Sequence, residues 1–234
     1  MTGARRRVLF VLVAVISAGL FAAAAYRRDA QTPRTERQAL LLLTGLPLLF
    51  GEDFSLKASG SPALTSLQAH YRVIPISITD PRELAKGRLL LMAQPMAQTA
   101  ENLVALDDWV RAGGRVLLLA DPMLEWPSER PLGDPLRPPP MFMDTGLLAH
   151  WGLRLDAPDV RGPAKRGLGG REMLVVSPGR LQGQCAVSSD GFVARCRIGK
   201  GWATVVADAD FLNVEDKAPN LEGLVSELAR VGGK

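Results

Sequence analysis

The sequence has few of the residues that build metal centres or nucleophilic active sites, with two cysteines and two histidines among 234 residues. His70 and His150 each precede an aromatic residue, and neither has a second ligand at a spacing that zinc sites use. Covalent catalysis requires a nucleophile held against a base, and the sequence shows no such pair. We therefore expect no metal, no cofactor and no catalytic residue, and we predict that the chain is not an enzyme.

Most of the chain has no excess of basic over acidic residues, although its formal net charge is +4. Residues 1–37 carry seven arginines against Asp29 and Glu36, whereas residues 38–234 carry the other 21 Lys and Arg against 22 Asp and Glu. Proteins that bind nucleic acids carry a basic stripe on the folded domain itself. We therefore expect no nucleic-acid partner.

Long apolar runs are also rare, and one stands near the N-terminus between Arg5-Arg6-Arg7 and Arg27-Arg28. It extends from Val8 to Ala25, and as a helix these 18 residues span roughly 27 Å, close to the hydrocarbon thickness of a bilayer. The run is longer than the apolar core of most signal peptides, which favours an uncleaved signal-anchor. The small residues Ala22–Ala25 keep a cleaved signal peptide as the alternative.

The leading basic residues and the free amino terminus favour a cytoplasmic N-terminus and an exported C-terminal part. We predict a signal-anchor transmembrane segment over residues 1–28, a polar tether over 29–37 and a single α/β domain over 38–234. The protein is then a single-pass protein of the bacterial inner membrane with a periplasmic domain.

The two cysteines lie on either side of a hairpin signal, Asp190-Gly191. With a two-residue turn there, the numbers of paired positions sum to 381, which places Cys185 directly opposite Cys196. Opposed residues lie about 4.5–5.5 Å apart at Cα, within the reach of a disulfide. We predict a structural disulfide formed in an oxidising compartment, and two free thiols are the alternative.

Apolar runs rich in β-formers alternate with helical patterns through the first half of the domain. Strands are expected at 39–46, 73–78, 88–93 and 115–120, and helices at 61–71, 81–85 and 99–111. This alternation predicts βαβ units in a mostly parallel sheet with helices on both faces. Later we expect a short helix at 146–151, strands at 153–155, 173–176 and 203–207, the cysteine hairpin, and a final helix at 221–231. The Gly- and Arg-rich residues 161–171 are expected to form a mobile loop.

Between these halves, residues 122–140 contain seven prolines in 19 positions, which excludes a helix or an interior strand. A long loop after the carboxyl end of a strand lies where open α/β sheets bind ligands. Because prolines lower the cost of ordering a loop, this loop with Trp126 is the expected contact surface. Trp151 is a further candidate for stacking on a ligand.

Several carboxylates follow predicted strands at one edge of the sheet. Asp121 follows one strand, and Asp208 and Asp210 follow another. Carboxylate oxygens bind hard cations such as Mg²⁺, so a divalent-metal-dependent hydrolase is the alternative function. The favoured interpretation is that these side chains cap loops and helix starts.

The order of these segments resembles a known family. The residues that carry the resemblance are Gly113-Gly114-Arg115-Val116-Leu117-Leu118-Leu119-Ala120-Asp121-Pro122, Leu147-Leu148-Ala149-His150-Trp151-Gly152-Leu153, Ile198-Gly199-Lys200-Gly201 and Ala207-Asp208-Ala209-Asp210-Phe211-Leu212-Asn213. They resemble the auxiliary domain of uncharacterised ABC-type transport systems, the group that includes the gliding-motility auxiliary component. The resemblance implies a flavodoxin-like fold similar to class I glutamine amidotransferases, with a C-terminal β-hairpin added here, and an ABC permease or ATPase as partner.

Amidotransferase relatives carry a Cys nucleophile on a tight strand-to-helix turn. The corresponding turn here, Leu91-Met92-Ala93-Gln94-Pro95-Met96, contains no Cys or Ser. We therefore expect the fold without the parent chemistry. The predicted function is a non-catalytic, membrane-tethered periplasmic accessory domain that recognises a partner or ligand.

Overall fold

The computed structural model describes residues 37–50, 60–214 and 218–233, so the predicted signal-anchor over residues 1–28 lies outside the described residues. From Gln38 onward, the described residues form one compact unit. None of the described helices is both long enough and apolar enough to cross a membrane.

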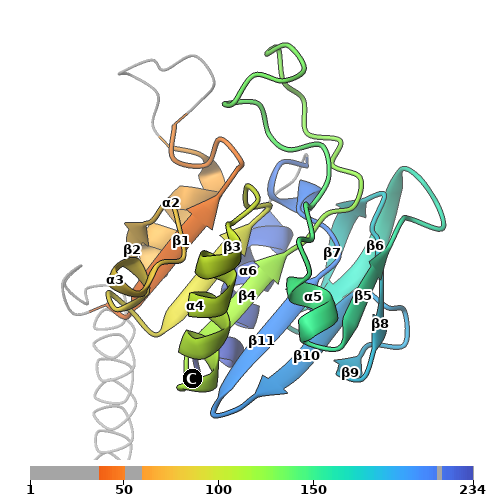
Figure 1. The fold of residues 1–234 in the computed structure, drawn as a ribbon. Coiled ribbons are helices and arrows are strands. Elements are labelled where there is room, and N and C mark those ends of the chain that lie inside the picture. The colour runs from red at the N-terminus through yellow and green to blue at the C-terminus, as the bar shows by residue number, and fades with distance from the viewer. Residues whose placement is uncertain (1–36, 51–59, 215–217, 234) are drawn as a thin grey trace, which may run out of the picture. The chain divides into compact units, whose positions relative to one another are not determined.

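The centre of this unit is a seven-stranded, mostly parallel sheet, which confirms the predicted α/β class (Figure 1). In spatial order its strands are β2 (Arg72–Pro75), β1 (Ala39–Thr44), β3 (Leu89–Ala93), β4 (Arg115–Leu119), β11 (Gly201–Val206), β10 (Val193–Ile198) and β9 (Ala186–Val187). The first five are parallel, whereas β10 runs antiparallel to β11, and β9 antiparallel to β10. All side chains of β3 and nearly all of β4 are buried, which explains why these strands read as unbroken apolar runs.

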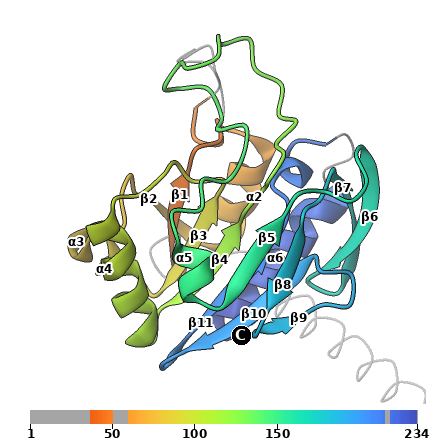
Figure 2. The same cartoon turned by 45° about the vertical axis from the view of Figure 1, so that its right-hand side comes forward.

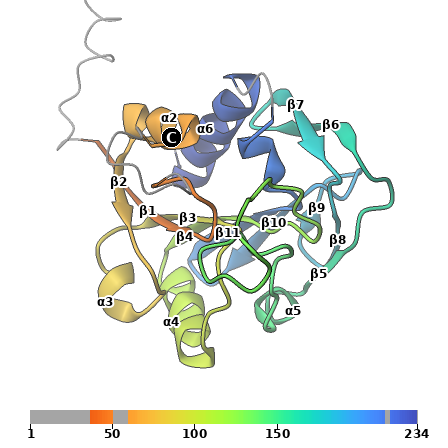
Figure 3. The same ribbon diagram turned by 90° about the horizontal axis from the view of Figure 1, so that it is seen from above.

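Helices cover both faces of the sheet, as the view from above shows (Figure 3). On one face lie α2 (Pro62–His70) and α6 (Ala218–Gly232), and on the other lie α3 (Pro81–Leu84), α4 (Ala100–Arg111) and α5 (Leu147–His150). The N-termini of α2 and α4 begin at the predicted caps, because the side chains of Ser61 and Thr99 accept hydrogen bonds from backbone N–H groups of the first turn. Below, the edge formed by the amino ends of the parallel strands is called the amino edge, and the opposite one the carboxyl edge.

Two small antiparallel pairs lie beside the main sheet (Figure 2). In these pairs β5 (Leu153–Asp156) lies beside β8 (Arg180–Gly183), and β6 (Pro163–Leu168) beside β7 (Arg171–Val176). The prediction that residues 161–171 form a mobile loop is therefore wrong. Gly169 and Gly170, which read as loop residues, both adopt positive φ in the tight turn between β6 and β7.

Cys185 and Cys196 form the predicted disulfide, with their Cα atoms 4.8 Å apart. The observed pairs, Ala186 with Arg195 and Val187 with Ala194, have the predicted register. The connection is longer than the expected two-residue turn. Ser188 N–H donates to the carbonyl of Val193 (2.8 Å), which leaves residues 189–192 as the loop.

Removing this disulfide is expected to lower the free energy of unfolding by about 2–3 kcal/mol, since it closes a short loop in the unfolded chain. Urea unfolding of the variant Cys185→Ala/Cys196→Ala, compared with wild type, measures the loss. Wild type unfolded with reductant is the matched control, because it opens the same loop and keeps both side chains. A variant as stable as oxidised wild type would contradict a stabilising role.

Candidate functional site

Three of the predicted site residues converge at the carboxyl edge. Because β4 and β11 are parallel neighbours whose ends pair in register, Asp121 and Asp208 leave adjacent strands at the same level. Asp210 follows in the short 3-10 helix η1 (Asp210–Leu212). All three side chains are buried. The expectation that strand-end carboxylates meet at one edge therefore agrees with the sheet order.

The oxygens of these carboxylates accept hydrogen bonds from backbone N–H groups of separate segments. Asp121 accepts from Met123 (2.8 Å) and Ala209 (2.9 Å), Asp208 from Phe211 (2.9 Å) and Val176 (3.1 Å), and Asp210 from Glu125 (2.7 Å). These bonds join the loop after β4, the loop after β11 and the end of β7. The capping interpretation accounts for the positions of all three acids.

Burial and mutual proximity raise the pKa of these carboxyl groups. Desolvation raises the pKa of Asp121 to about 6, with backbone N–H groups opposing the rise and Glu125 adding to it. Desolvation also raises the pKa of Asp210 to about 7, and the charges of Asp121 and Glu125 add to this rise. Desolvation, together with Asp121 and Asp210, raises the pKa of Asp208 well above its ordinary value. Near neutral pH the cluster therefore retains protons, which relieves repulsion between the acids.

The carboxylates are not arranged as a metal centre. Among the residues that the structure describes, no group of three or more His, Cys, Asp or Glu side chains is placed to hold a metal ion. Both oxygens of Asp121 and of Asp208 already accept backbone hydrogen bonds, and retained protons compete with a cation. The described geometry gives the alternative of a metal-dependent hydrolase no support.

The Pro-rich loop is fixed to the sheet by Gln94, the residue that follows β3. Gln94 is buried and has a φ of +43°, which is uncommon for residues other than glycine. Its side-chain oxygen accepts from the N–H of Asp121 (2.9 Å), and its side-chain amide donates to the carbonyls of Asp121 (3.1 Å) and Pro139 (3.3 Å). One side chain thus joins both ends of the loop. The turn over residues 91–96, which corresponds to the nucleophile turn of amidotransferases, therefore holds a glutamine with a structural role.

Further bonds close the base of the loop and hold its tip. The base is closed by hydrogen bonds from Leu124 N–H to the Pro140 carbonyl (3.0 Å) and from Phe142 N–H to the Asp121 carbonyl (2.6 Å). At the tip, the guanidinium of Arg130 pairs with Asp134 (3.4 Å), and Arg137 donates to the carbonyl of Arg130. The loop therefore has a defined conformation although much of it faces solvent.

This loop lies beyond the carboxyl edge of the sheet (Figure 2), and several of its large apolar side chains are exposed. Leu132 is 83% exposed, and Leu136, Met141 and Met143 are each about half exposed. We call these four side chains the loop surface. Trp126, which was predicted at the contact surface, is partly buried and packs against the core. Large apolar side chains that are exposed on an anchored loop are candidates for contact with a partner.

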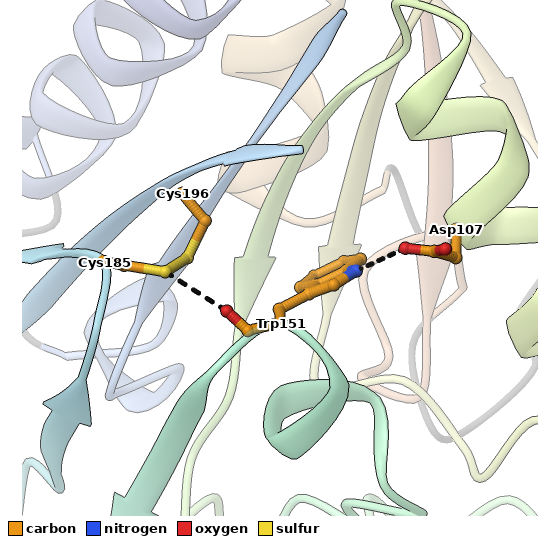
Figure 4. Close-up of a disulfide and its surroundings, with 4 residues drawn as sticks. All are labelled: Asp107, Trp151, Cys185 and Cys196. Carbon is orange, nitrogen blue, oxygen red and sulfur yellow. Dashed lines mark hydrogen bonds between the residues drawn. A yellow bond between two sulfur atoms is a disulfide. The ribbon is translucent and has the colours of Figure 1, made fainter. Parts of the chain in front are cut away.

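Trp151 was predicted to bind a ligand, but in the structure it is a buried packing residue. The residue is 6% exposed, and its Nε1 donates to Asp107 on α4 (2.9 Å; Figure 4). Its carbonyl oxygen lies 3.4 Å from Cys185 Sγ. The ring therefore packs between α4 and the disulfide hairpin, and its proximity to the Pro-rich loop in sequence is misleading.

A second polar cluster, centred on Asp107, was missed by the sequence analysis. Arg111 Nε lies 2.6 Å from the Asp107 carboxylate, and His150 Nε2 lies 3.2 Å from it. Although desolvation raises the pKa of Asp107, the bonds from Arg111, Trp151 and His150 hold it below its ordinary value. The cluster borders a mostly apolar cavity of about 560 Å³ between α4 and the start of α5, which has room for a small ligand with one polar group. No sequence spacing could reveal this cluster, because Asp107 and His150 are 43 positions apart.

No family model and no curated protein matches this chain. Solved structures do resemble it. One is the exo-β-1,4-mannosidase Op5Man5 from Opitutaceae bacterium strain TAV5, with 13% identity, a TM-score of 0.46, and coverage of 84% of this chain and 34% of the mannosidase. A β-galactosidase from Bacillus circulans sp. alkalophilus has 15% identity, a TM-score of 0.46, and coverage of 85% and 31%. Cytoplasmic protein STM3548 from Salmonella typhimurium has 10% identity, a TM-score of 0.51, and coverage of 82% and 98%.

The chain spans about a third of the length of these two glycosidases, and at such identities the likeness concerns the fold alone. The matches nevertheless correct the prediction that the chain is not an enzyme. That prediction rested on the missing nucleophile–base pair, and the solved structures that resemble this chain include glycoside hydrolases. The missing pair therefore does not exclude catalysis.

Proposed function

We propose that this chain is a membrane-tethered recognition domain of the bacterial cell envelope that binds a protein partner through the loop surface. The observation that carries the proposal is the combination of anchoring and exposure in the Pro-rich loop. Gln94 and the buried carboxylates hold the base of the loop, while Leu132 and its neighbours face solvent. A loop that is ordered before binding loses little conformational entropy on binding.

The N-terminal apolar run and the disulfide support a location outside the cytoplasm. We assign residues 1–28 to a signal-anchor in the inner membrane and the domain from Gln38 onward to the periplasm. Disulfides such as Cys185–Cys196 persist in oxidising compartments, among them the bacterial periplasm.

The partner that we propose is the permease of an ABC-type transport system, with its ATPase recovered through the permease. The support is the resemblance of segments such as 113–122 and 207–213 to the auxiliary domain of such systems. From the same resemblance we propose that the sheet and its helices have a flavodoxin-like arrangement similar to that of class I glutamine amidotransferases. A periplasmic domain reaches the outer side of a permease directly.

Replacing apolar side chains of the loop surface is expected to abolish recovery of the partner. The full-length protein is crosslinked in its native membrane, solubilised in detergent and pulled down, and its partners are identified by mass spectrometry. We expect the variant Leu132→Ser/Leu136→Ser to recover about tenfold less permease and ATPase than wild type, because a few apolar anchors carry most of the energy of an interface.

The variant Leu174→Ser is the matched control, because it replaces an exposed leucine of β7, outside the loop surface. Its recovery of the transporter is expected to equal that of wild type. A wild-type protein that recovers no transporter component would contradict the ABC partner. Equal recovery by the loop variant and wild type would contradict the role of the loop surface.

A further inference from the structure

The amino edge of the sheet carries a row of basic residues. Arg72 opens β2 beside the start of β1, and Arg88 immediately precedes β3. Arg115 opens β4 and pairs with Trp202 of β11, which in turn pairs with Arg197 of β10. All of these side chains are exposed except that of Arg115, which is partly exposed. This edge lies at the bottom of Figure 1.

The end of α4 and the β10–β11 turn continue the row. The backbone N–H of Lys200 in this turn donates to the carbonyl of Arg111, the last residue of α4 (2.9 Å). Both side chains are exposed. Among the described residues, Arg72, Arg88, Arg115, Arg197 and Lys200 form no ion pair with a carboxylate.

A small basic cavity opens beside Trp202. Its volume is about 200 Å³, and its lining includes Arg115, Arg195, Arg230 and Trp202. Arg195 and Arg230 both pair with the buried carboxylate of Glu227, and the Nε of Arg195 is buried with no hydrogen-bond partner in the described structure. Arg195 and Arg230 thus share one carboxylate, whereas the third guanidinium group of the cavity, that of Arg115, donates to the carbonyl of Val231 (2.8 Å). Desolvation lowers the pKa of both Arg195 and Arg230, and the charge of Arg195 adds to the effect on Arg230.

The charge at this edge differs in sign from that of the domain as a whole. The cations that the strand register, the β10–β11 turn and the cavity place there are Arg72, Arg88, Arg111, Arg115, Arg195, Arg197, Lys200 and Arg230, and the carboxylates paired with them are Asp107 and Glu227. Eight cations against two carboxylates leave six positive charges, whereas residues 38–234 carry 21 basic and 22 acidic residues. The positive charge is therefore gathered at the amino edge, and the buried acids lie at the carboxyl edge.

We propose that the amino edge docks on the anionic phospholipid headgroups of the bilayer that holds the N-terminal segment, with the cavity of Arg115, Arg195 and Arg230 receiving a headgroup phosphate. This inference rests on the proposed membrane tether. The chain enters the described unit at Gln38, directly before β1 and therefore at the amino edge. The nine tether residues 29–37 reach at most about 30 Å when extended, which keeps this edge near the membrane surface.

The side chains of the edge have the chemistry that an anionic bilayer requires. Guanidinium groups form strong, paired hydrogen bonds with phosphate oxygens. Basic residues near an anionic lipid surface are attracted to it over about a Debye length, and tryptophan favours the headgroup level. Trp202, which is 41% exposed among these cations, is the aromatic residue at that position. Docking by this edge directs the carboxyl edge and its loop surface away from the bilayer, so the proposed contact with the permease is made by a part of the permease that projects into the periplasm.

Amine acetylation tests the docking at a single residue. The full chain is incorporated into nanodiscs of phosphatidylcholine alone, or of phosphatidylcholine with 30% phosphatidylglycerol, and treated with a limiting amount of acetylating reagent. We expect acetylation of Lys200 to be about tenfold slower in the anionic discs, as measured by mass spectrometry. Lys165, an exposed lysine of β6, is the internal control and is expected to react at equal rates in both discs.

Two charge variants separate specific docking from a general effect of charge. Arg88→Gln/Arg197→Gln removes two cations of the amino edge and keeps Lys200 as the reporter, so the protection is expected to fall to about threefold or less. Arg171→Gln/Arg180→Gln removes two exposed cations from β7 and β8 and is expected to keep the protection. Salt at 1 M, where the Debye length is about 3 Å, is expected to abolish it.

The outcomes distinguish the docking from the tether on which it rests. A full chain that does not co-purify with the discs contradicts the membrane tether. A chain that co-purifies, but whose Lys200 reacts at the same rate in both discs, overturns the docking and leaves the tether intact. Equal protection in both charge variants also overturns it, because the basic edge is then not what binds the lipid.

Discussion

Raising the pH from 5 to 8 is expected to lower the midpoint of thermal unfolding by roughly 6–12 °C, because the buried acids must ionise in the folded state. The pKa of Asp121 is raised from 3.8 to about 6, and that of Asp210 from 3.8 to about 7. The folded state therefore binds protons more tightly than the unfolded state between these values. The resulting stabilisation is fully present below about pH 4 and is lost as the pH rises through 6 to 7. The whole shift at Asp121 corresponds to about 3 kcal/mol, of which about half is lost between pH 5 and 6.

The variant Asp210→Asn isolates the contribution of the acid cluster. Its amide oxygen still accepts from the N–H of Glu125, but the side chain does not ionise. We expect the difference in unfolding midpoint between pH 5 and pH 8 to shrink by about half, as measured by scanning fluorimetry of the full chain. Asp159→Asn changes an exposed carboxylate outside the cluster and is the control. A wild-type midpoint that rises over this pH range would contradict the assignment.

The sheet could be predicted because its strands carry their own signals. The unbroken apolar runs of β1, β3 and β4 are typical of strands buried on both faces, and the caps Ser61 and Thr99 determine where α2 and α4 begin. The convergence of Asp121 with Asp208 follows from the same pattern, since each lies two residues past the end of a parallel strand.

Other features depend on contacts between distant segments, which a local pattern does not contain. The hairpin of β6 and β7 reads as a flexible loop, because its turn is a pair of glycines and its exposed positions hold charged residues. The ring of Trp151 lies close in sequence to the Pro-rich loop but packs against Asp107 on α4, 44 positions away. Neither arrangement has a spacing signal, so neither could be read before the fold was known.

The role of Gln94 also depends on contacts between distant segments, since its partners lie 27 and 45 positions away. We expect Gln94→Ala to lower the free energy of unfolding by about 3–5 kcal/mol. The substitution leaves the N–H of Asp121 and the carbonyl of Pro139 without their buried partners, whereas the carbonyl of Asp121 keeps the hydrogen bond from Phe142 N–H. Each buried group costs about 1–3 kcal/mol when unpaired. Urea unfolding measures the loss, and Gln182→Ala on the exposed face of β8 is the control, expected to change stability by about 0.5 kcal/mol or less.

Two further variants separate the hydrogen bonds of Gln94 from its backbone conformation. Gln94→Gly loses the same hydrogen bonds but relieves the cost of a φ of +43°, so it is expected to be about 1 kcal/mol more stable than Gln94→Ala. Gln94→Glu keeps an acceptor for the N–H of Asp121 but places a charge beside the acid cluster, so its loss is expected to grow between pH 5 and 8. If Gln94 fixes the loop, limited proteolysis of Gln94→Ala cuts within residues 122–142 faster than in wild type. Cleavage there at the wild-type rate would show that the loop keeps its conformation without Gln94. The ordering of the loop before binding, on which the proposed recognition depends, would then have to come from Asp121 and Asp210 alone.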